Sequence, residues 1–390
     1  MKGKSKFLCG VLLSLLLVSL SAGLVTAAED FAITAESAVL LDSDTGQVLY
    51  AKNAHQRLAP ASLTKIMTLL VTMDVIDDGQ ASLNDKVTIS RYAESMGGSQ
   101  IFLAAGEQVT LENLLEAVAI ASANDASVAV AEFVAGTESN FVQKMNEKAE
   151  ELGLKDTHFV NSNGLPTEGN NHYSSAYDIA VMSRALITKH PRVLEWTKIW
   201  VDYLQLRDRK AMMVNTNSLV NKYPGLDGLK TGHTTEAGFC LSATAERSGF
   251  RLISVVFKTA SEEARNDNTI KLLDYGFRAF ERTVIVKEGD EVPDIPVKNG
   301  KALTVKGQMG ETFHGVILKG TRNEVTQEIR VREGLEAPIK KGDELGQVVI
   351  KQGDRVLGYV PIRASEDVER ANIFVRIWRA IIAWLRGLFA

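Results

Sequence analysis

The pattern of apolar residues changes at about residue 283, and that change constrains the fold more than any other feature of the sequence. Between residues 283 and 365 only short strand candidates occur, separated by turn-forming pairs such as Gly342-Asp343. A chain of 390 residues is also too long for one ordinary domain. Before residue 283, helical spacing of apolar residues is clearest at 62–76, 110–135, 177–188 and 262–280. We therefore expect two domains of different class.

The first domain, residues 29–282, is expected to be of the α/β (α+β) class, with helices flanking a mainly antiparallel sheet. A hairpin is predicted near its start, where apolar runs at 38–41 and 47–50 flank a turn. Further strands are predicted much later in the domain, at 226–231, 239–245 and 250–257. The second domain, residues 283–365, is expected to be small and all-β, with strand candidates at 284–286, 303–305, 329–331 and 348–350.

The N-terminal segment has the pattern of an export signal. Within residues 1–28, basic residues precede the apolar run 7–20, and we expect cleavage after Ala27 or Ala28. An uncleaved membrane anchor is the alternative. Cleavage leaves Cys240 as the only cysteine. No disulfide can then form within the mature chain, so its core must supply the stability.

The C-terminal segment, residues 366–390, is expected to form an amphipathic helix that begins near Asn372. One face carries three arginines, Arg376, Arg379 and Arg386, and a broad opposite arc is aliphatic and aromatic. This pattern favours a helix lying in a membrane interface, where the arginines would add affinity for anionic lipid. The segment is too short and too charged to span a bilayer. A terminal helix docked on its own protein is the alternative.

Charge and composition exclude several classes of function. A net charge of -4 gives the whole molecule no field that would favour nucleic acid. The 6 histidines are scattered, without a His-x-x-x-His pair or a Cys/His cluster, and no glycine-rich phosphate loop occurs. We therefore expect no metal ion and no cofactor, so that side chains must carry any chemistry.

Three short motifs can carry that chemistry, and the first is Ser62-Leu63-Thr64-Lys65. At the start of a predicted helix, a spacing of three places Ser62 and Lys65 on one face, one turn apart. A serine hydroxyl is a weak nucleophile until a neighbouring base takes its proton. Lys65 can act as that base only if burial or a nearby positive charge lowers its pKa. By itself the motif equally suits a helix N-cap followed by a surface lysine.

The second motif, Ser122-Ala123-Asn124, interrupts the helical segment 110–135. Its hydroxyl and carboxamide can face one cleft, where Ser122 would relay a proton and Asn124 would bind the substrate backbone. Asn124 or Asp125 is expected to cap the helix that resumes there. Simple punctuation between two helices is the alternative explanation.

The third motif, Lys230-Thr231-Gly232, ends a predicted strand and is followed by His233 and Thr234. Gly232 has no side chain to block a ligand, so an extended peptide can pair along this strand edge. Lys230 is expected to supply a fixed positive charge for a substrate carboxylate. If the two lysines lie close, that charge also favours the neutral form of the lysine in the first motif. An exposed strand end is the alternative.

The order and spacing of the motifs are more informative than any one of them. Ser-x-x-Lys, then Ser-x-Asn about 60 residues later and Lys-Thr-Gly about 108 residues further on, form the signature of penicillin-binding proteins and class A β-lactamases. Longer stretches resemble the low-molecular-mass D-alanyl-D-alanine carboxypeptidases, at 59–68, 120–127, 159–165 and 228–234. The resemblance covers nearly the whole mature chain, including the β domain and the tail.

This resemblance implies a β-lactamase-like serine acyltransferase fold and a role for each motif. Ser62 would form the acyl-enzyme and Lys65 would be the general base. Ser122 and Asn124 would complete the proton relay and the substrate contacts.

The resemblance also assigns the substrate site. The residues implied to bind substrate are Lys230, Thr231, Gly232, His233, Thr234 and Arg265, with Arg251 as the competitor of Arg265. Backbone amides of Ser62 and of a residue near His233 or Thr234 would form the oxyanion hole.

The implied substrate is a peptidoglycan stem pentapeptide, which would lose its terminal D-alanine, and β-lactams would be covalent inhibitors. The implied location is the outer face of the cytoplasmic membrane, with the tail as a peripheral anchor. A β-lactamase is the near rival, but no Glu-x-x-Leu-Asn segment lies between the second and third motifs. A silent binding protein is the other rival, although every motif position is present. A biosynthetic transpeptidase would usually bring a spanning helix or an extra large domain.

Overall fold

The computed structural model describes residues 32–169 and 171–388. The predicted export signal, residues 1–28 with cleavage after Ala27 or Ala28, lies outside the described residues.

A five-stranded antiparallel sheet forms the centre of the first domain. Its strand order is β2-β1-β9-β8-β7. The strands are β1 (Ser37–Asp42), β2 (Val48–Lys52), β7 (Leu226–Thr234), β8 (Gly238–Arg247) and β9 (Phe250–Thr259). The predicted hairpin and the three later strands are therefore confirmed, and the sheet takes its strands from both ends of the domain. β7, which carries the third motif, is an edge strand of this sheet.

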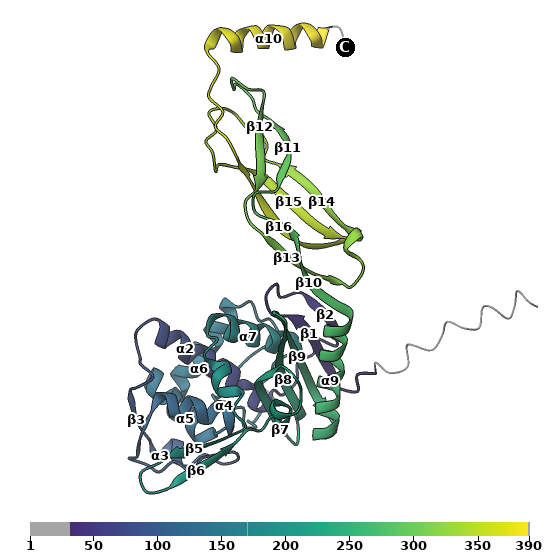
Figure 1. The fold of residues 1–390 in the computed structure, drawn as a ribbon. Helices are drawn as coiled ribbons and strands as arrows, with labels where there is room; N and C mark the ends of the chain where they lie inside the picture. The colour runs from purple at the N-terminus through teal and green to yellow at the C-terminus, as the bar shows by residue number, and fades with distance from the viewer. Residues whose placement is uncertain (1–31, 170, 389–390) are drawn as a thin grey trace, which may run out of the picture. The chain divides into compact units, whose positions relative to one another are not determined.

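Helices cover both faces of the sheet (Figure 1). α9 (Glu262–Ala279) packs on one face, and α7 (Ala176–Lys189) packs on the other. Beyond α7 lie α4 (Leu111–Ile120), α5 (Asn124–Ala135) and α6 (Glu138–Glu151), with the shorter α3 (Arg91–Glu94). The short α8 (Val193–Thr197) contacts β7 and α4. Two small hairpins complete this side: β3 (Lys86–Thr88) with β4 (Gln108–Thr110), and β5 (Val201–Gln205) with β6 (Lys210–Val214).

One helix lies at the centre of this layer. α2 (Lys65–Asp77) follows the 3-10 turn η1 (Ala61–Thr64) and contacts α4, α5, α6 and α7. Every residue from 65 to 74 is buried, so α2 has no solvent-facing side over most of its length. The first motif thus begins a core helix, and its lysine cannot be a surface residue.

The predicted cap of α5 is wrong. The helix begins at Asn124, with Ala123 in the capping position and no side-chain cap hydrogen bond. The Asn124 side chain is directed elsewhere, and Asp125 instead accepts hydrogen bonds from the backbone of Ile101 and Leu103. Side-chain caps are present at other helices, for example at Thr110, whose side chain accepts a hydrogen bond from the Asn113 amide.

The second domain is all-β and has its own apolar core. β10 (Phe280–Val286) pairs with β13 (Phe313–Leu318). A five-stranded antiparallel sheet has the order β11-β12-β16-β15-β14. Its strands are β11 (Glu291–Pro296), β12 (Thr304–Met309), β14 (Val325–Val331), β15 (Glu344–Gln352) and β16 (Arg355–Ala364). The mixed α/β class with an all-β C-terminal domain is therefore confirmed.

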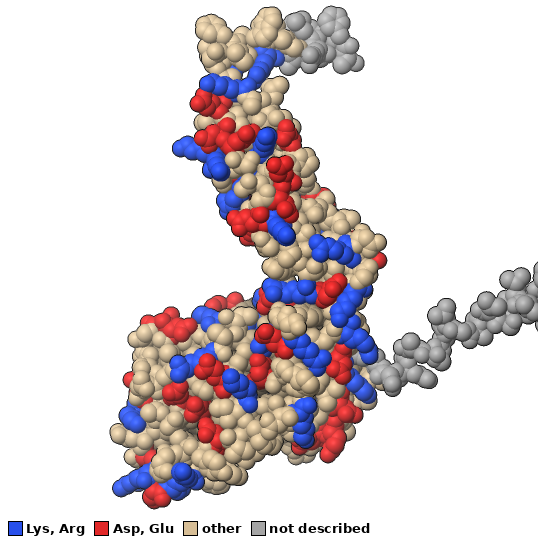
Figure 2. Space-filling view, in the orientation of Figure 1, with Lys and Arg blue, Asp and Glu red and all other residues tan. Residues whose placement is uncertain are grey.

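The described chain ends in a helix, α10 (Ile373–Leu388). Within the described residues, no helix combines the length and the apolar character needed to cross a membrane. On the face seen in Figure 2, acidic and basic side chains are interspersed over both domains and no large area of one sign stands out.

Candidate active site

The first motif brings a serine hydroxyl and a lysine amine into contact. Ser62 lies in η1 and Lys65 begins α2. In a 3-10 turn, side chains three residues apart lie almost directly above one another. Lys65 Nζ lies 3.0 Å from Ser62 Oγ, as the spacing predicts.

Burial makes the Lys65 amine a base. The side chain is 0 % exposed and makes no ion pair within the described residues. Desolvation lowers the pKa of Lys65 well below its usual value, the charge of Lys230 lowers it further, and Asp125 opposes both. Lys65 Nζ donates to Asn124 Oδ1 at 2.7 Å and to the Asn163 carbonyl at 2.6 Å. A neutral amine has two hydrogens for these two acceptors, which leaves its lone pair for the Ser62 hydroxyl.

The second motif orients this amine. Asn124 Nδ2 donates to the Gly97 carbonyl at 2.7 Å, so the Oδ1 atom of the same amide faces Lys65. Ser122 has a φ of 59° and is 3 % exposed. Within the described part of the chain, the Ser122 hydroxyl makes no hydrogen bond and is available to another group.

The third motif places a second buried amine on the edge strand. Lys230 is 1 % exposed, and its Nζ donates to the Thr231 carbonyl at 3.2 Å. Burial, and then the charge of Arg265, lower the pKa of Lys230 to about 7. The expectation of a fixed positive charge therefore needs correction, because an isolated Lys230 is only partly protonated near neutral pH. A bound carboxylate would restore its charge.

Gly232 is required by the protein's own packing. A Cβ atom at this position would lie 2.9 Å from the Pro60 carbonyl oxygen and 3.3 Å from Ala61 Cβ. The glycine thus lets β7 approach the turn that carries Ser62, whereas the sequence suggested that it makes room for a ligand.

Thr231 and the two residues that follow the third motif have different partners. Thr231 Oγ1 donates to Thr216 Oγ1 at 2.6 Å. The exposed His233 ring lies 4.1 Å from the Phe239 ring, measured between centroids. Thr234 Oγ1 accepts a hydrogen bond from the Ala237 amide. Thr234 is therefore the residue that closes the turn after β7.

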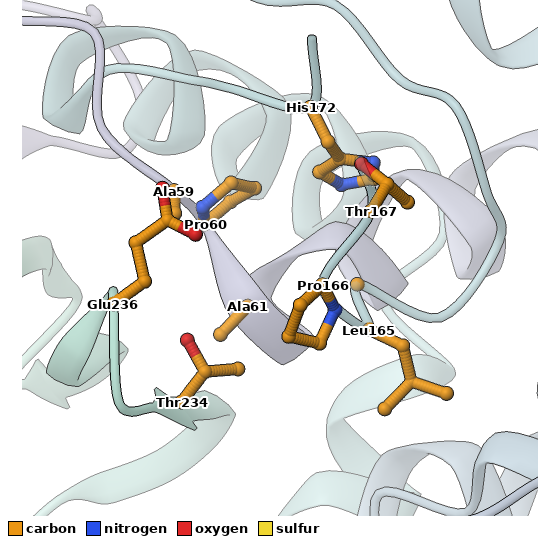
Figure 3. Close-up of a pocket in the computed structure, with 10 residues that line it drawn as sticks. Ala59, Pro60, Ala61, Leu165, Pro166, Thr167, His172, Thr234 and Glu236 are labelled. Atoms are coloured by element: carbon orange, nitrogen blue, oxygen red, sulfur yellow. The ribbon is translucent and has the colours of Figure 1, made fainter. Parts of the chain in front are cut away.

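A cleft runs beside the turn that carries the serine (Figure 3). Residues 59–61 form one part of its wall and residues 164–167 another, with His172 behind the latter. Thr234, the last residue of β7, and Glu236, in the turn that follows, lie across from them. The residues that directly precede the first motif, the loop 164–167 and the end of the edge strand therefore converge on one opening.

The two candidate arginines have different surroundings. Arg251 forms a two-pronged pair with Asp227, with both N–O distances 2.8 Å. Arg265, on α9, is 4 % exposed and lies close enough to Lys230 to lower the pKa of that lysine. Arg265 forms an ion pair with Glu262, whose side chain is half exposed. These contacts favour Arg265 as the arginine of the site, and its substrate role stays a prediction.

Comparison with known proteins identifies the class of this serine–lysine site. Residues 24–261 match the family model described as D-alanyl-D-alanine carboxypeptidase. The chain belongs to the D-alanyl-D-alanine carboxypeptidase family. Residues 280–370 match the model of the penicillin-binding protein 5 C-terminal domain. The chain is therefore a hydrolase with the two-domain build of low-molecular-mass penicillin-binding proteins.

Several carboxypeptidases are similar over most of their length. The D-alanyl-D-alanine carboxypeptidase DacF of Bacillus subtilis is 45 % identical over 92 % of each chain. DacA of Haemophilus influenzae is 35 % identical over 92 % of this chain and 91 % of its own. The crystal structure of penicillin-binding protein 5 from H. influenzae superposes with a TM-score of 0.77, at 34 % identity, over 89 % of this chain and all (100 %) of that chain.

The segment around Asn163 contributes to the site of this carboxypeptidase although it contains none of the three motifs. The Asn163 carbonyl binds Lys65, and the preceding carbonyl of Ser162 accepts hydrogen bonds from Thr68 on α2 and Ser127 on α5. Ser162 is itself held by Glu138, which accepts from its amide and its hydroxyl. Backbone carbonyls leave no residue-type signature, so the only sequence signal was the resemblance of 159–165 to the family.

Proposed function

We propose that this protein cleaves the bond between two terminal D-alanines through an acyl-enzyme on Ser62. One observation carries the proposal: the Ser62 hydroxyl lies 3.0 Å from an amine that is buried, unpaired with any carboxylate within the described residues, and depressed in pKa. Lys65 takes the hydroxyl proton as Ser62 attacks the carbonyl carbon. The proton then passes to the departing nitrogen, and the free Ser122 hydroxyl is the candidate relay.

The substrate's terminal carboxylate supplies the binding energy at the other end of the site. We place it at Lys230 and Arg265, because both cations are buried and neither has a buried carboxylate partner among the described residues. A carboxylate there would satisfy the donors of Lys230 and raise its pKa. A peptide that lacks the carboxylate should therefore bind poorly.

Mass spectrometry of a pentapeptide ending in D-Ala-D-Ala tests the proposal. We expect release of one D-alanine by the mature protein and none by Ser62→Ala. Lack of release by a well-folded wild type would refute the carboxypeptidase activity. Faster turnover of benzylpenicillin than of the peptide would instead support the β-lactamase alternative.

Penicillin should also acylate Ser62 and remain attached for many catalytic cycles. A penicillin-binding protein D2 from Listeria monocytogenes, 34 % identical, has been solved in an ampicillin-bound form with a TM-score of 0.57 over 62 % of this chain and 97 % of its own. A peptide-mapping adduct at a residue other than Ser62 would refute the assignment of the nucleophile.

We also propose that the protein is exported and held at the outer face of the cytoplasmic membrane by α10. Support comes from the N-terminal signal pattern and from the exposed large apolar side chains among those described in α10, which are Ile373, Phe374, Val375, Ile377, Trp378 and Ile381. These side chains would bury several hundred Å2 in the interface, worth several kcal/mol at about 25 cal/mol per Å2.

Two arginines of α10 contact the β domain, whereas the amphipathic pattern of the sequence predicted that they bind anionic lipid. Arg376 Nε donates to Asn299 Oδ1 at 3.1 Å, and Arg379 donates to the Gly300 carbonyl at 2.7 Å. These two side chains hold the helix on the β domain, so they are not free for anionic lipid. Arg386 lies where side chains are not described. We therefore expect binding that depends on apolar area and only weakly on salt.

Flotation with liposomes tests the anchor. The mature protein should float, and a form that ends before Asn372 should not, while both release D-alanine from soluble peptide. A matched pair sharpens the test: Trp378→Glu should abolish flotation, whereas Arg379→Ala should retain it. Equal flotation of the full and shortened forms would show that α10 does not anchor the protein.

A further inference from the structure

A buried histidine contacts the first motif although no motif contains it. His172 is 9 % exposed, and its Nε2 atom lies 2.7 Å from Thr64 Oγ1, one residue before Lys65. Its Nδ1 atom lies 3.2 Å from the Val160 amide nitrogen. The Phe159 ring packs edge-on against the imidazole, with centroids 5.8 Å apart. His172 is therefore held from three sides and directed at Thr64.

The direction of each hydrogen bond follows from the donors available. The Val160 amide can only donate, so Nδ1 accepts and the imidazole proton is on Nε2. Burial, with smaller effects of His158 and Lys65, lowers the pKa of His172 to about 4, which keeps the ring neutral. Nε2–H then donates to Thr64 Oγ1, and the Thr64 hydroxyl donates to the Ala61 carbonyl at 2.8 Å. The donor and the acceptor of each of these hydrogen bonds are therefore assigned.

This series of hydrogen bonds ends on the peptide group between Ala61 and Ser62. The Ala61 carbonyl and the Ser62 amide belong to the same planar unit, so orienting the carbonyl also orients the Ser62 N–H. Ala61 has a φ of 47°, which is unusual for alanine. A Cβ atom at Gly164 would lie 1.9 Å from the Ala61 oxygen, so the loop 164–167 presses against the same group. Contacts from two sides thus hold a strained turn in place.

We infer that His172 and Thr64 are positioning residues that hold the Ser62 amide where the oxyanion of the tetrahedral intermediate forms. This rests on the proposed acyl-enzyme mechanism at Ser62 and on the family resemblance, which implies that this amide is one donor of the oxyanion hole. An oxyanion donor acts on the transition state much more than on the bound substrate. Loss of the hydrogen bonds from His172 through Thr64 to Ala61 should therefore lower kcat and leave KM nearly unchanged.

Two pairs of variants test this in the full mature protein. Thr64→Ser keeps the hydroxyl, whereas Thr64→Val keeps the shape and removes the donor. His172→Gln can place an amide NH2 near the Nε2 position, whereas His172→Asn reaches only the Nδ1 position. Removal of a whole oxyanion donor costs about 10²–10³-fold in kcat, so misorientation of one should cost about 10-fold.

We expect Thr64→Val and His172→Asn to lose about 10-fold in kcat for D-alanine release and in the rate of penicillin acylation. Thr64→Ser and His172→Gln should stay within about threefold of wild type, and KM should change less than about twofold in all four. Melting temperatures measured alongside identify any effect of unfolding. A similar kcat within each pair, or a change confined to KM, would overturn the inference. Wild type that releases no D-alanine would overturn the proposed function and the inference together.

Discussion

The two ends of helix α2 bury charged groups in opposite ways. At its first residue, the Lys65 amine has hydrogen-bond acceptors but no ion pair within the described residues, and its pKa is strongly lowered. In its last turn, the Asp74 carboxylate has three partners: the amines of Lys189 at 2.6 Å and Lys148 at 2.9 Å, and the imidazole of His190 at 2.7 Å. Burial alone would raise the pKa of Asp74, but these partners outweigh it and the pKa is lowered.

The difference separates a functional site from a structural one on the same helix. A buried charge with partners stays charged and ties segments together, here α2 with α6 and the end of α7. A buried amine without a carboxylate becomes neutral and gains a lone pair, which folding does not need but proton transfer does. The lowered pKa of Asp74 therefore indicates a structural ion pair, whereas the lowered pKa of Lys65 indicates a functional base. The presence or absence of an oppositely charged partner distinguishes the two cases.

The largest expected effect is on catalysis at the first end. Lys65→Met should slow penicillin acylation by about 10²–10⁴-fold, since it removes the general base. Its free energy of unfolding should fall by no more than about 2 kcal/mol, because the neutral amine contributes only hydrogen bonds. Stopped-flow acylation and urea denaturation measure the two quantities. A variant that acylated at the wild-type rate would show that Lys65 is not the base.

The reverse result is expected at the other end. Asp74→Asn should lower the free energy of unfolding by about 2–4 kcal/mol, because Lys148 and His190 lose their shared partner, while kcat of the folded fraction is retained. Because the folded pKa of Asp74 is lowered, its stabilisation is present above the unfolded pKa of about 3.9 and is lost as pH falls through the folded value. The difference between wild type and variant should thus disappear at strongly acidic pH. Loss of kcat at neutral pH without loss of stability would contradict the comparison.

The smallest effect concerns Lys230, whose charge depends on pH. Its pKa of about 7 in the free protein means that a substrate carboxylate meets fewer protonated molecules as pH rises through 7. We expect kcat/KM for a peptide carboxylate to decline by about 3- to 10-fold above that pH, with Arg265 limiting the loss. Lys230→Arg, which stays charged, should remove the decline. An identical profile in both proteins would place the carboxylate elsewhere.

Much of the site could be predicted from the sequence because its signals are local. Spacing of three between Ser62 and Lys65 has one geometric meaning in a helix or a 3-10 turn, and the two atoms lie within hydrogen-bond distance. The apolar periodicity that predicted β7 and α2 is also a local signal, because it depends on residues close together in the chain. The predicted cap at Asn124 was wrong because a side chain with two possible uses is decided by its distant partner, here Lys65.

By itself the sequence determined the order of the three motifs, the class of each domain and the amphipathic pattern of α10, since all of these depend on residues near one another in the chain. Only the tertiary structure decided the electrostatics and the close approaches. The fall in the pKa of Lys65 comes from burial in a core and from a lysine 165 positions later in the chain, Lys230. Gly232 is required because β7 meets Pro60, and Arg251 is engaged because Asp227 folds against it. Desolvation and steric contact depend on what surrounds a residue in space, and no local pattern of residues encodes that.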